Sequence, residues 1–150
     1  LRENSNELRN YDIVFLNGFK KNQKIKNKIK KINNNLKIFD AIYKPINLKE
    51  YNLKNKFLFF CCIGNPHEFE NTLKKFKFKI KEKLIFPDHH SISDEIIENM
   101  KDFANKNNLK IITTEKDFLR LDKIIKKNIN FLKIKIKIIF GNTILTYRIN

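Results

Sequence analysis

Glycine is scarce in this sequence, and its scarcity excludes several glycine-dependent motifs. Only three glycines occur among 150 residues, at positions 18, 64 and 141. A G-x-x-x-x-G-K-S/T phosphate loop, a GxGxxG dinucleotide turn and a GxSxG nucleophile turn all need glycines within a few residues of one another. The sequence therefore contains none of these motifs. It also has no set of Cys and His residues with zinc-site spacing.

Cysteine is equally rare, and its placement argues against disulfides. Cys61 and Cys62 are adjacent within an apolar run, and there is no CxxC pair. Disulfide geometry fits poorly across one peptide bond, and free Cys in such a run behaves as a small hydrophobic residue. Both features favour a reducing, cytoplasmic setting.

Long apolar runs are also missing. No run approaches the ~18 residues of a membrane-spanning helix, and the first ten residues are too polar for a secretory signal. The composition, with 41% apolar residues in 150, is that of one globular domain. Because residue 1 is Leu rather than Met, we expect the chain to be part of something longer.

Positive charge is abundant, and two explanations for it remain open. Lys and Arg number 32 against 16 Asp and Glu, which gives a net charge of +16. Lys, Ile and Asn, all encoded by A- and T-rich codons, make up 74 residues, so codon bias explains the charge without any partner. A nucleic-acid or anionic membrane surface would also explain it. The low Arg count of four speaks against nucleic acid, where the planar Arg fork is favoured.

Apolar runs alternate with helical patterns along the chain. We expect strands over 11–17, 36–43, 57–63, 78–86, 109–113, 131–140 and 143–149, with a loop over 44–55. We expect helices over 22–32 and after Asn65, Ser93 and Thr114. The unbroken apolar run 57–63 is typical of a central parallel strand. The order predicts an α/β fold with a mostly parallel sheet and flanking helices, a Rossmann-like arrangement that ends in a β-hairpin.

Apolar spacing within the helices predicts which side chains are buried. The predicted buried stripes are Ile25, Ile29 and Ile32; Phe69, Leu73 and Phe76; Ile96, Met100 and Phe103; and Phe118, Leu121 and Ile125. Asn65 is the expected N-cap of the second helix, with Pro66 at its first position. Along 131–140, Ile alternates with Lys, which predicts a strand with one wet face.

Three of the loops that follow strands hold most of the chemically versatile residues, and in parallel sheets such loops carry function. They are Gly64-Asn65-Pro66, Asp88-His89-His90 and Thr113-Thr114-Glu115-Lys116-Asp117. Asp88-His89-His90 pairs a carboxylate with imidazoles, which either bind a divalent metal, transfer protons or simply form a capped turn. Thr113 to Asp117 combines two hydroxyls, two acids and Lys116. This loop is either a capped helix start or a phosphate site at a helix N-terminus.

Taken in order, these loops resemble the C-terminal half of the tetraacyldisaccharide 4'-kinase family, the lipid A 4'-kinases of Gram-negative bacteria. The matching stretches are Ile63-Gly64-Asn65-Pro66, Glu68-Phe69, Thr72-Leu73, Phe86-Pro87-Asp88-His89-His90, Thr113-Thr114-Glu115-Lys116-Asp117, and near the start Leu1-Arg2-Glu3 and Asp12-Ile13-Val14-Phe15-Leu16-Asn17-Gly18. The resemblance covers nearly the whole chain, and it lies in the order and spacing of individually weak motifs.

The resemblance implies a two-lobed P-loop kinase that uses ATP and Mg2+. Such a kinase transfers the γ-phosphate to the 4'-hydroxyl of a lipid A disaccharide precursor, at the inner face of the cytoplasmic membrane. It implies catalytic roles for Asp88 and His89, with His89 as a candidate magnesium ligand. The nucleotide- or substrate-binding residues that it implies are Asn17, Gly18, Asn65, Pro66, His90, Thr114, Glu115, Lys116 and Asp117.

The chain departs from the family by lacking the phosphate loop. We therefore expect residues 1–150 to be the C-terminal part of a two-lobed kinase whose N-terminal half is missing here. Phosphoryl transfer depends on positioning and charge stabilisation, so the chain alone should be inactive. This hypothesis expects no nucleic-acid partner. Two alternatives are a basic nucleic-acid-binding α/β module, with 14 Phe and 4 Tyr available for stacking, and a remnant without function.

Overall fold

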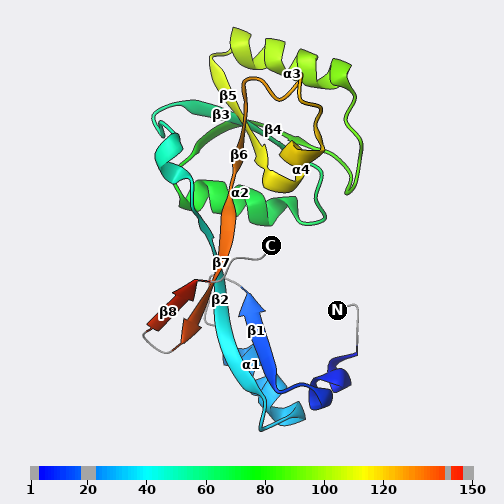
Figure 1. The fold of residues 1–150 in the computed structure, drawn as a ribbon, viewed down its shortest axis with the longest axis vertical. Coiled ribbons are helices and arrows are strands. Elements are labelled where there is room, and N and C mark those ends of the chain that lie inside the picture. Colours follow the sequence, from blue (N-terminus) through cyan, green and yellow to red (C-terminus); the bar gives the residue numbers. More distant parts are fainter. Residues whose placement is uncertain (1–3, 18–22, 141–142, 147–150) are drawn as a thin grey trace. The chain divides into compact units, whose positions relative to one another are not determined.

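The computed structural model describes residues 4–17, 23–140 and 143–146, and these fall into two units with one sheet each (Figure 1). One unit is formed by Leu1–Pro45 together with Ile134–Asn150, and the other by Ile46–Lys133. The predicted α/β class is confirmed, although the strands divide between two sheets. In the described part of the chain, no helix is both long enough and apolar enough to cross a membrane.

The unit Ile46–Lys133 contains a four-stranded, all-parallel sheet in the order β4-β3-β5-β6. Its strands are β3 (Lys56–Cys61), β4 (Lys79–Ile85), β5 (Leu109–Thr114) and β6 (Ile129–Leu132). The predicted central strand is confirmed, because β3 pairs with β4 on one side and β5 on the other. Five consecutive β3 residues, beginning at Phe57, are buried, as a strand covered on both faces requires.

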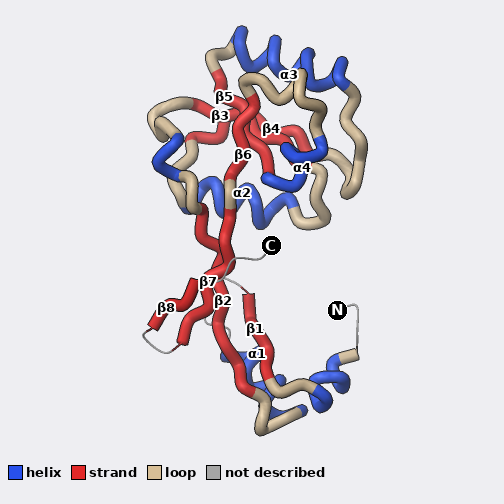
Figure 2. Tube along the Cα trace, viewed as in Figure 1, coloured by secondary structure: helices blue, strands red, loops and turns tan. Residues whose placement is uncertain are grey.

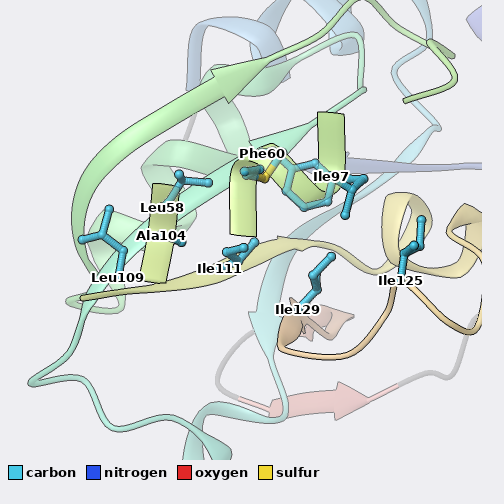
Figure 3. Packing of buried hydrophobic residues seen from close by; sticks show 9 residues of the cluster. Leu58, Phe60, Ile97, Ala104, Leu109, Ile111, Ile125 and Ile129 are labelled. Atoms are coloured by element: carbon cyan, nitrogen blue, oxygen red, sulfur yellow. The ribbon is translucent and has the colours of Figure 1, made fainter. Parts of the chain in front are cut away.

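Helices cover both faces of this parallel sheet. They are α2 (Pro66–Lys75), α3 (Asp94–Lys106) and the short α4 (Glu115–Arg120), with a 3-10 turn η2 (Leu48–Glu50) before β3. Successive β3 side chains point to opposite faces, so they enter two separate cores. Leu58 and Phe60 pack in the core that α3 covers, which Figure 3 shows, and Phe57 and Phe59 pack in the core that α2 covers.

The three helix starts predicted from capping residues are confirmed. The side chain of Asn65 accepts the N–H of Glu68 at 3.3 Å, with Pro66 at the first helical position as predicted. Ser93 and Thr114 likewise accept backbone N–H groups three residues ahead, at 3.4 and 3.1 Å. Each cap satisfies a donor that the helix itself cannot satisfy.

The predicted buried stripe of α3 is wrong by one residue position. Ile97, Met100 and Ala104 are buried, whereas Ile96 and Phe103 are 38% and 45% exposed. Both sets have helical spacing and share Met100, so spacing alone does not distinguish them. The small Ala104 side chain lies in the core with strand residues, which puts the bulkier Phe103 at the edge.

The helix predicted to run through Ile125 is shorter than expected. It ends at Arg120, and Leu121 takes an extended backbone with φ −72° and ψ 151°. Leu121 and the buried Ile125 nevertheless pack against the same core as Phe118. The apolar spacing therefore identified core residues correctly and the backbone conformation incorrectly.

The other unit contains a mixed sheet in the order β1-β2-β7-β8. Its described elements are η1 (Ser5–Asn10), β1 (Ile13–Asn17), α1 (Gln23–Ile32), β2 (Lys37–Pro45), β7 (Ile134–Phe140) and β8 (Thr143–Thr146). β1 and β2 are parallel, and β7 is antiparallel to both β2 and β8. The predicted terminal hairpin is confirmed as β7 with β8, while its turn residues Gly141 and Asn142 lie outside the described residues.

The single strand predicted over 131–140 is wrong, because it is two strands in different sheets (Figure 2). Between β6 and β7 lies Lys133, whose backbone is engaged outside both ladders. Its N–H donates to Asn47 Oδ1 and its carbonyl accepts the N–H of Ile46, both at 2.9 Å. These two bonds lie at the point in the chain where β6 has ended and β7 is about to begin.

The loop predicted over 44–55 is partly wrong as well. Strand β2 continues through Pro45, which pairs with Ile134 of β7, and η2 follows. Proline lacks the N–H that a fully paired strand needs. It is tolerated here because β1 pairs with β2 only as far as Ala41, which leaves the end of β2 with one neighbour.

Candidate functional site

The predicted site residues of the parallel-sheet unit lie on the loops that follow β3, β4 and β5. In a parallel sheet these carboxyl ends lie at one edge. The structure brings to this edge the predicted residues Asn65, Pro66, Asp88, His89, His90, Thr114, Glu115, Lys116 and Asp117. Asn17 ends β1 in the other unit, and Gly18 lies outside the described residues.

The carboxylate of Asp88, on the loop after β4, is approached by the loops after β3 and β5. Its Oδ1 lies 3.7 Å from Lys116 Nζ, and its Oδ2 lies 3.8 Å from His89 Nε2. From the third loop, Gly64 comes so close that a Cβ at this position would lie 3.2 Å from Asp88 Oδ2. The Asp88 side chain is 44% exposed, so the carboxylate is both surrounded and accessible.

The two histidines beside Asp88 are presented to solvent by a tight turn. The N–H of His89 donates to Asp88 Oδ1 at 3.0 Å, and the N–H of His90 donates to the Pro87 carbonyl at 3.1 Å. The ring of His90 stacks on Phe86 with its plane within 1° of parallel. The imidazole of His89 is 74% exposed.

The loop after β5 is held by a buried carboxylate. Asp117 is only 3% exposed, and its Oδ2 accepts the backbone N–H of Cys62 at 3.0 Å and the hydroxyl of Thr114 at 2.8 Å. The hydroxyl of Thr113 donates to the Phe60 carbonyl at 2.7 Å. The capped-helix interpretation of this loop is therefore confirmed, and both threonine hydroxyls are engaged within the protein. Lys116 is the side chain that reaches Asp88.

A cavity of about 390 Å3 lies beside this loop. Its lining includes Cys62, His90, Ser93, Asp117 and Arg120. Burial, reinforced by the Asp117 carboxylate, raises the pKa of Cys62 to about 11 and that of Cys61 to about 12. Neither thiol is ionised near neutral pH, so neither acts as a nucleophile there.

Asp88 is the residue at this edge that could hold a magnesium ion together with a phosphate ligand. Within the described residues, no group of three or more His, Cys, Asp or Glu side chains is placed to hold a metal ion. Mg2+ is commonly bound through one or two carboxylates plus substrate phosphates and water. The exposed carboxylate of Asp88 suits that mode, in which the nucleotide brings most of the ligands.

Sequence reasoning missed Arg120, the last residue of α4. Its Nη2 donates to the carbonyl oxygens of His89 and His90, at 3.0 and 3.4 Å. Two signals were available in the sequence. Arg120 is one of only four arginines, and it follows Asp117 by three residues on a predicted helix.

Comparisons with known proteins found a matching family and similar relatives. The family model described as Tetraacyldisaccharide-1-P 4'-kinase (LpxK) matches residues 1–149. A tetraacyldisaccharide 4'-kinase of Pelagibacter ubique (strain HTCC1062) is 44% identical over 138 residues, which cover 89% of this chain and 43% of that protein. One of Elusimicrobium minutum (strain Pei191) is 30% identical over 156 residues, with 92% and 41% covered.

The fold has a match among solved structures. The crystal structure of LpxK from Aquifex aeolicus in complex with ATP is similar with a TM-score of 0.52 and 22% identity. The similarity covers 92% of this chain and 42% of that one. The chain thus spans about two fifths of the length of the relatives it matches.

Proposed function

Because the chain belongs to the tetraacyldisaccharide 4'-kinase family, we propose that it forms part of an ATP-dependent lipid A kinase. The proposed reaction transfers the γ-phosphate of ATP to the 4'-hydroxyl of a lipid A disaccharide precursor. The structural observation that carries the proposal is that the loops after β3 and β5 approach Asp88. His89 and Lys116 lie beside its carboxylate.

Within this reaction, Asp88 and His89 act as the proton-accepting pair. An imidazole takes a proton from a hydroxyl most effectively when a carboxylate orients it. His89 Nε2 lies 3.8 Å from Asp88 Oδ2, within reach of such a contact after a small side-chain rotation. Lys116, on the other side of Asp88, offers a cation to the negative charge of a transferred phosphoryl group.

Asp88 is the residue that we place next to magnesium. When bound with ATP, the metal neutralises charge on the phosphate oxygens. Direct coordination of Mg2+ by His89 stays a prediction. The oxygen atoms of Asp88 suit this ion better, since Mg2+ prefers oxygen over nitrogen ligands. The nucleotide- or substrate-binding roles of the remaining predicted residues, Asn17 and Asn65 among them, stay predictions as well.

The phosphate loop must come from outside these 150 residues, because the sequence has none. We therefore propose that this chain is one lobe of a two-lobed kinase and has no activity by itself. We also propose that it works in the cytoplasm as a peripheral protein at the inner membrane face. The net charge of +16 supports that location, since each Lys near an anionic surface contributes about 1 kcal/mol.

A chimeric kinase tests the proposal. The segment of the Pelagibacter ubique kinase that aligns with this chain is replaced by residues 1–150, and transfer of labelled phosphate from ATP to tetraacyldisaccharide 1-phosphate is measured. We expect the chimera to form product and the isolated chain to form none. Asp88→Asn and His89→Ala should each lower kcat by about 100-fold or more.

A matched control uses a residue of the same type away from the three loops. Asp102→Asn on α3 changes an exposed side chain and should leave kcat at the parental value. Product formation by the isolated chain would contradict the two-lobe proposal. A folded chimera without activity would contradict the kinase function, and Asp88→Asn at the parental rate would contradict the role of Asp88.

A further inference from the structure

Arg120 connects the end of α4 to the loop after β4, 30 residues earlier in the sequence. One guanidinium nitrogen, Nη2, donates to the His89 carbonyl at 3.0 Å and to the His90 carbonyl at 3.4 Å. Both acceptors are backbone atoms, so the contact acts on the path of the chain rather than on a side chain. It holds the two peptide planes that immediately follow His89 and His90.

His89 occupies an uncommon backbone conformation. Its φ is 61°, in the left-handed region that residues with a Cβ rarely adopt. It is the third residue of a turn closed by the hydrogen bond from His90 to Pro87. Gly or Asn is favoured at a turn position with positive φ. A His persists there when surrounding contacts determine the backbone.

Contacts on both sides of His89 restrain its backbone, and Arg120 supplies one of them. On the N-terminal side of its Cα atom, the N–H of His89 donates to Asp88 Oδ1 at 3.0 Å. On the carbonyl side, the peptide plane between His89 and His90 is held by the bond from the His90 N–H to the Pro87 carbonyl and also by Arg120. These contacts together fix the direction of the Cα–Cβ bond that carries the imidazole. Arg suits this task because its planar group has several donors in a fixed arrangement, whereas Lys has a mobile point charge.

The element that carries Arg120 is itself anchored to the sheet. Asp117, three residues earlier on α4, accepts the N–H of Cys62 directly after β3. Arg120 therefore connects the loop after β4 to a helix that is itself hydrogen-bonded to the end of β3.

We propose that Arg120 is a positioning residue that sets the backbone of His89 and thereby aims its imidazole at the reacting hydroxyl. The inference rests on the proposed kinase function for its catalytic consequence. Its structural part, that Arg120 determines the conformation of the loop after β4, is independent of any activity.

Nuclear magnetic resonance of the 150-residue chain tests the structural part. In Arg120→Ala and Arg120→Lys, we expect shifted His89 and His90 amide signals. The three-bond HN–Hα coupling of His89, which reports φ, should also change. Lys126→Ala is the matched control, because Lys126 also binds a backbone carbonyl at α4, that of Leu119 at 3.4 Å, without touching the histidine loop. It should leave both His89 observables unchanged.

Kinetics of the chimera test the catalytic part. Arg120→Ala and Arg120→Lys should lower kcat by roughly tenfold to 100-fold, as expected for a displaced reacting group. The KM for ATP should change little. Added guanidinium ion should restore part of kcat in Arg120→Ala but not in Asp88→Asn, a readout that a general loss of stability would not produce. Lys126→Ala should keep the parental kcat.

The outcomes separate the two proposals. Unchanged His89 signals in Arg120→Ala would overturn the positioning role. Changed signals with the parental kcat would overturn its catalytic consequence. If His89→Ala also keeps the parental kcat, the proposed function of His89 fails, while the amide signals still decide whether Arg120 sets the loop.

Discussion

The buried carboxylate of Asp117 accepts the backbone N–H of Cys62 at 3.0 Å, across 55 residues of sequence. The same oxygen accepts the hydroxyl of Thr114, so one atom joins the start of α4 to the residue after β3. From this fixed point Lys116 extends to Asp88 and Arg120 extends to the two histidines. Asp117 thus fixes the start of α4, the helix that carries both Lys116 and Arg120.

Removing the Asp117 carboxylate should destabilise the chain markedly. Asp117→Ala leaves the buried Cys62 N–H and Thr114 hydroxyl without their acceptor, and each orphaned group costs about 1–3 kcal/mol. We expect the free energy of unfolding in urea to fall by about 2–4 kcal/mol. Asp117→Asn should lose less, because one side-chain oxygen can still accept both bonds. The exposed Asp122→Asn serves as the control. Equal stability of all three variants would contradict this account.

The two cysteines should make stability fall at high pH. Burial raises the pKa of Cys61 to about 12 and of Cys62 to about 11, from an ordinary 9.0. The unfolded chain therefore releases thiol protons above pH 9 that the folded chain retains. Their contribution is complete below pH 9 and is lost as pH rises towards 11–12.

Urea unfolding at pH 8 and at about pH 10.5 checks this prediction. The unsubstituted chain should lose more stability between the two values than a Cys61→Ala, Cys62→Ala double variant, in which Lys titration is unchanged. The same pH dependence in both proteins would assign the loss to other groups.

Gly64→Ala should impair catalysis without unfolding the protein. A Cβ at position 64 would lie 3.2 Å from Asp88 Oδ2, so the carboxylate must move by a few tenths of an ångström. We expect the chimera to lose roughly tenfold in kcat, with a change in unfolding free energy below about 1 kcal/mol. Since the effect acts through Asp88, the Gly64→Ala, Asp88→Asn double variant should be no slower than Asp88→Asn. Additive losses would show that Gly64 acts elsewhere.

Neighbouring isoleucines on α3 should differ sharply in their effect on stability. Ile97 is fully buried, whereas Ile96 is 38% exposed. Ile97→Ala should lower the unfolding free energy by about 2–4 kcal/mol, and Ile96→Ala by less than about 1 kcal/mol. Chemical denaturation of the two variants measures the difference directly. A larger loss of stability in Ile96→Ala than in Ile97→Ala would contradict the observed burial and support the stripe predicted from the sequence.

Local signals in the sequence predicted the local structure well. The caps at Asn65, Ser93 and Thr114 and the central strand are confirmed. Each was predictable because its signal lies in residues that are close together in the sequence. The division into two sheets was not predictable in this way. The division coincides with bonds from Lys133 to Ile46 and Asn47, more than 80 residues away, and such long-range pairing leaves no local trace in the sequence.

The candidate site shows the same limit. The sequence predicted the loops around Asp88 and Lys116, since clustered acids, histidines and hydroxyls are visible as residue types. It did not predict Arg120, because the partners of that side chain are carbonyl oxygens, which every residue possesses. Nor did it predict that Asn17 lies in a different unit from the three loops.

The hydrogen bond between Ile46 and Lys133 joins the first and last residues of the unit that holds the site. A segment whose ends are neighbours interrupts its host chain at a single point. Residues 46–133 could therefore be exchanged as one block by recombination. Such an exchange would add or remove no strand of the β1-β2-β7-β8 sheet. The same adjacency makes this segment suitable for circular permutation, with Ile46 and Lys133 as the joined ends.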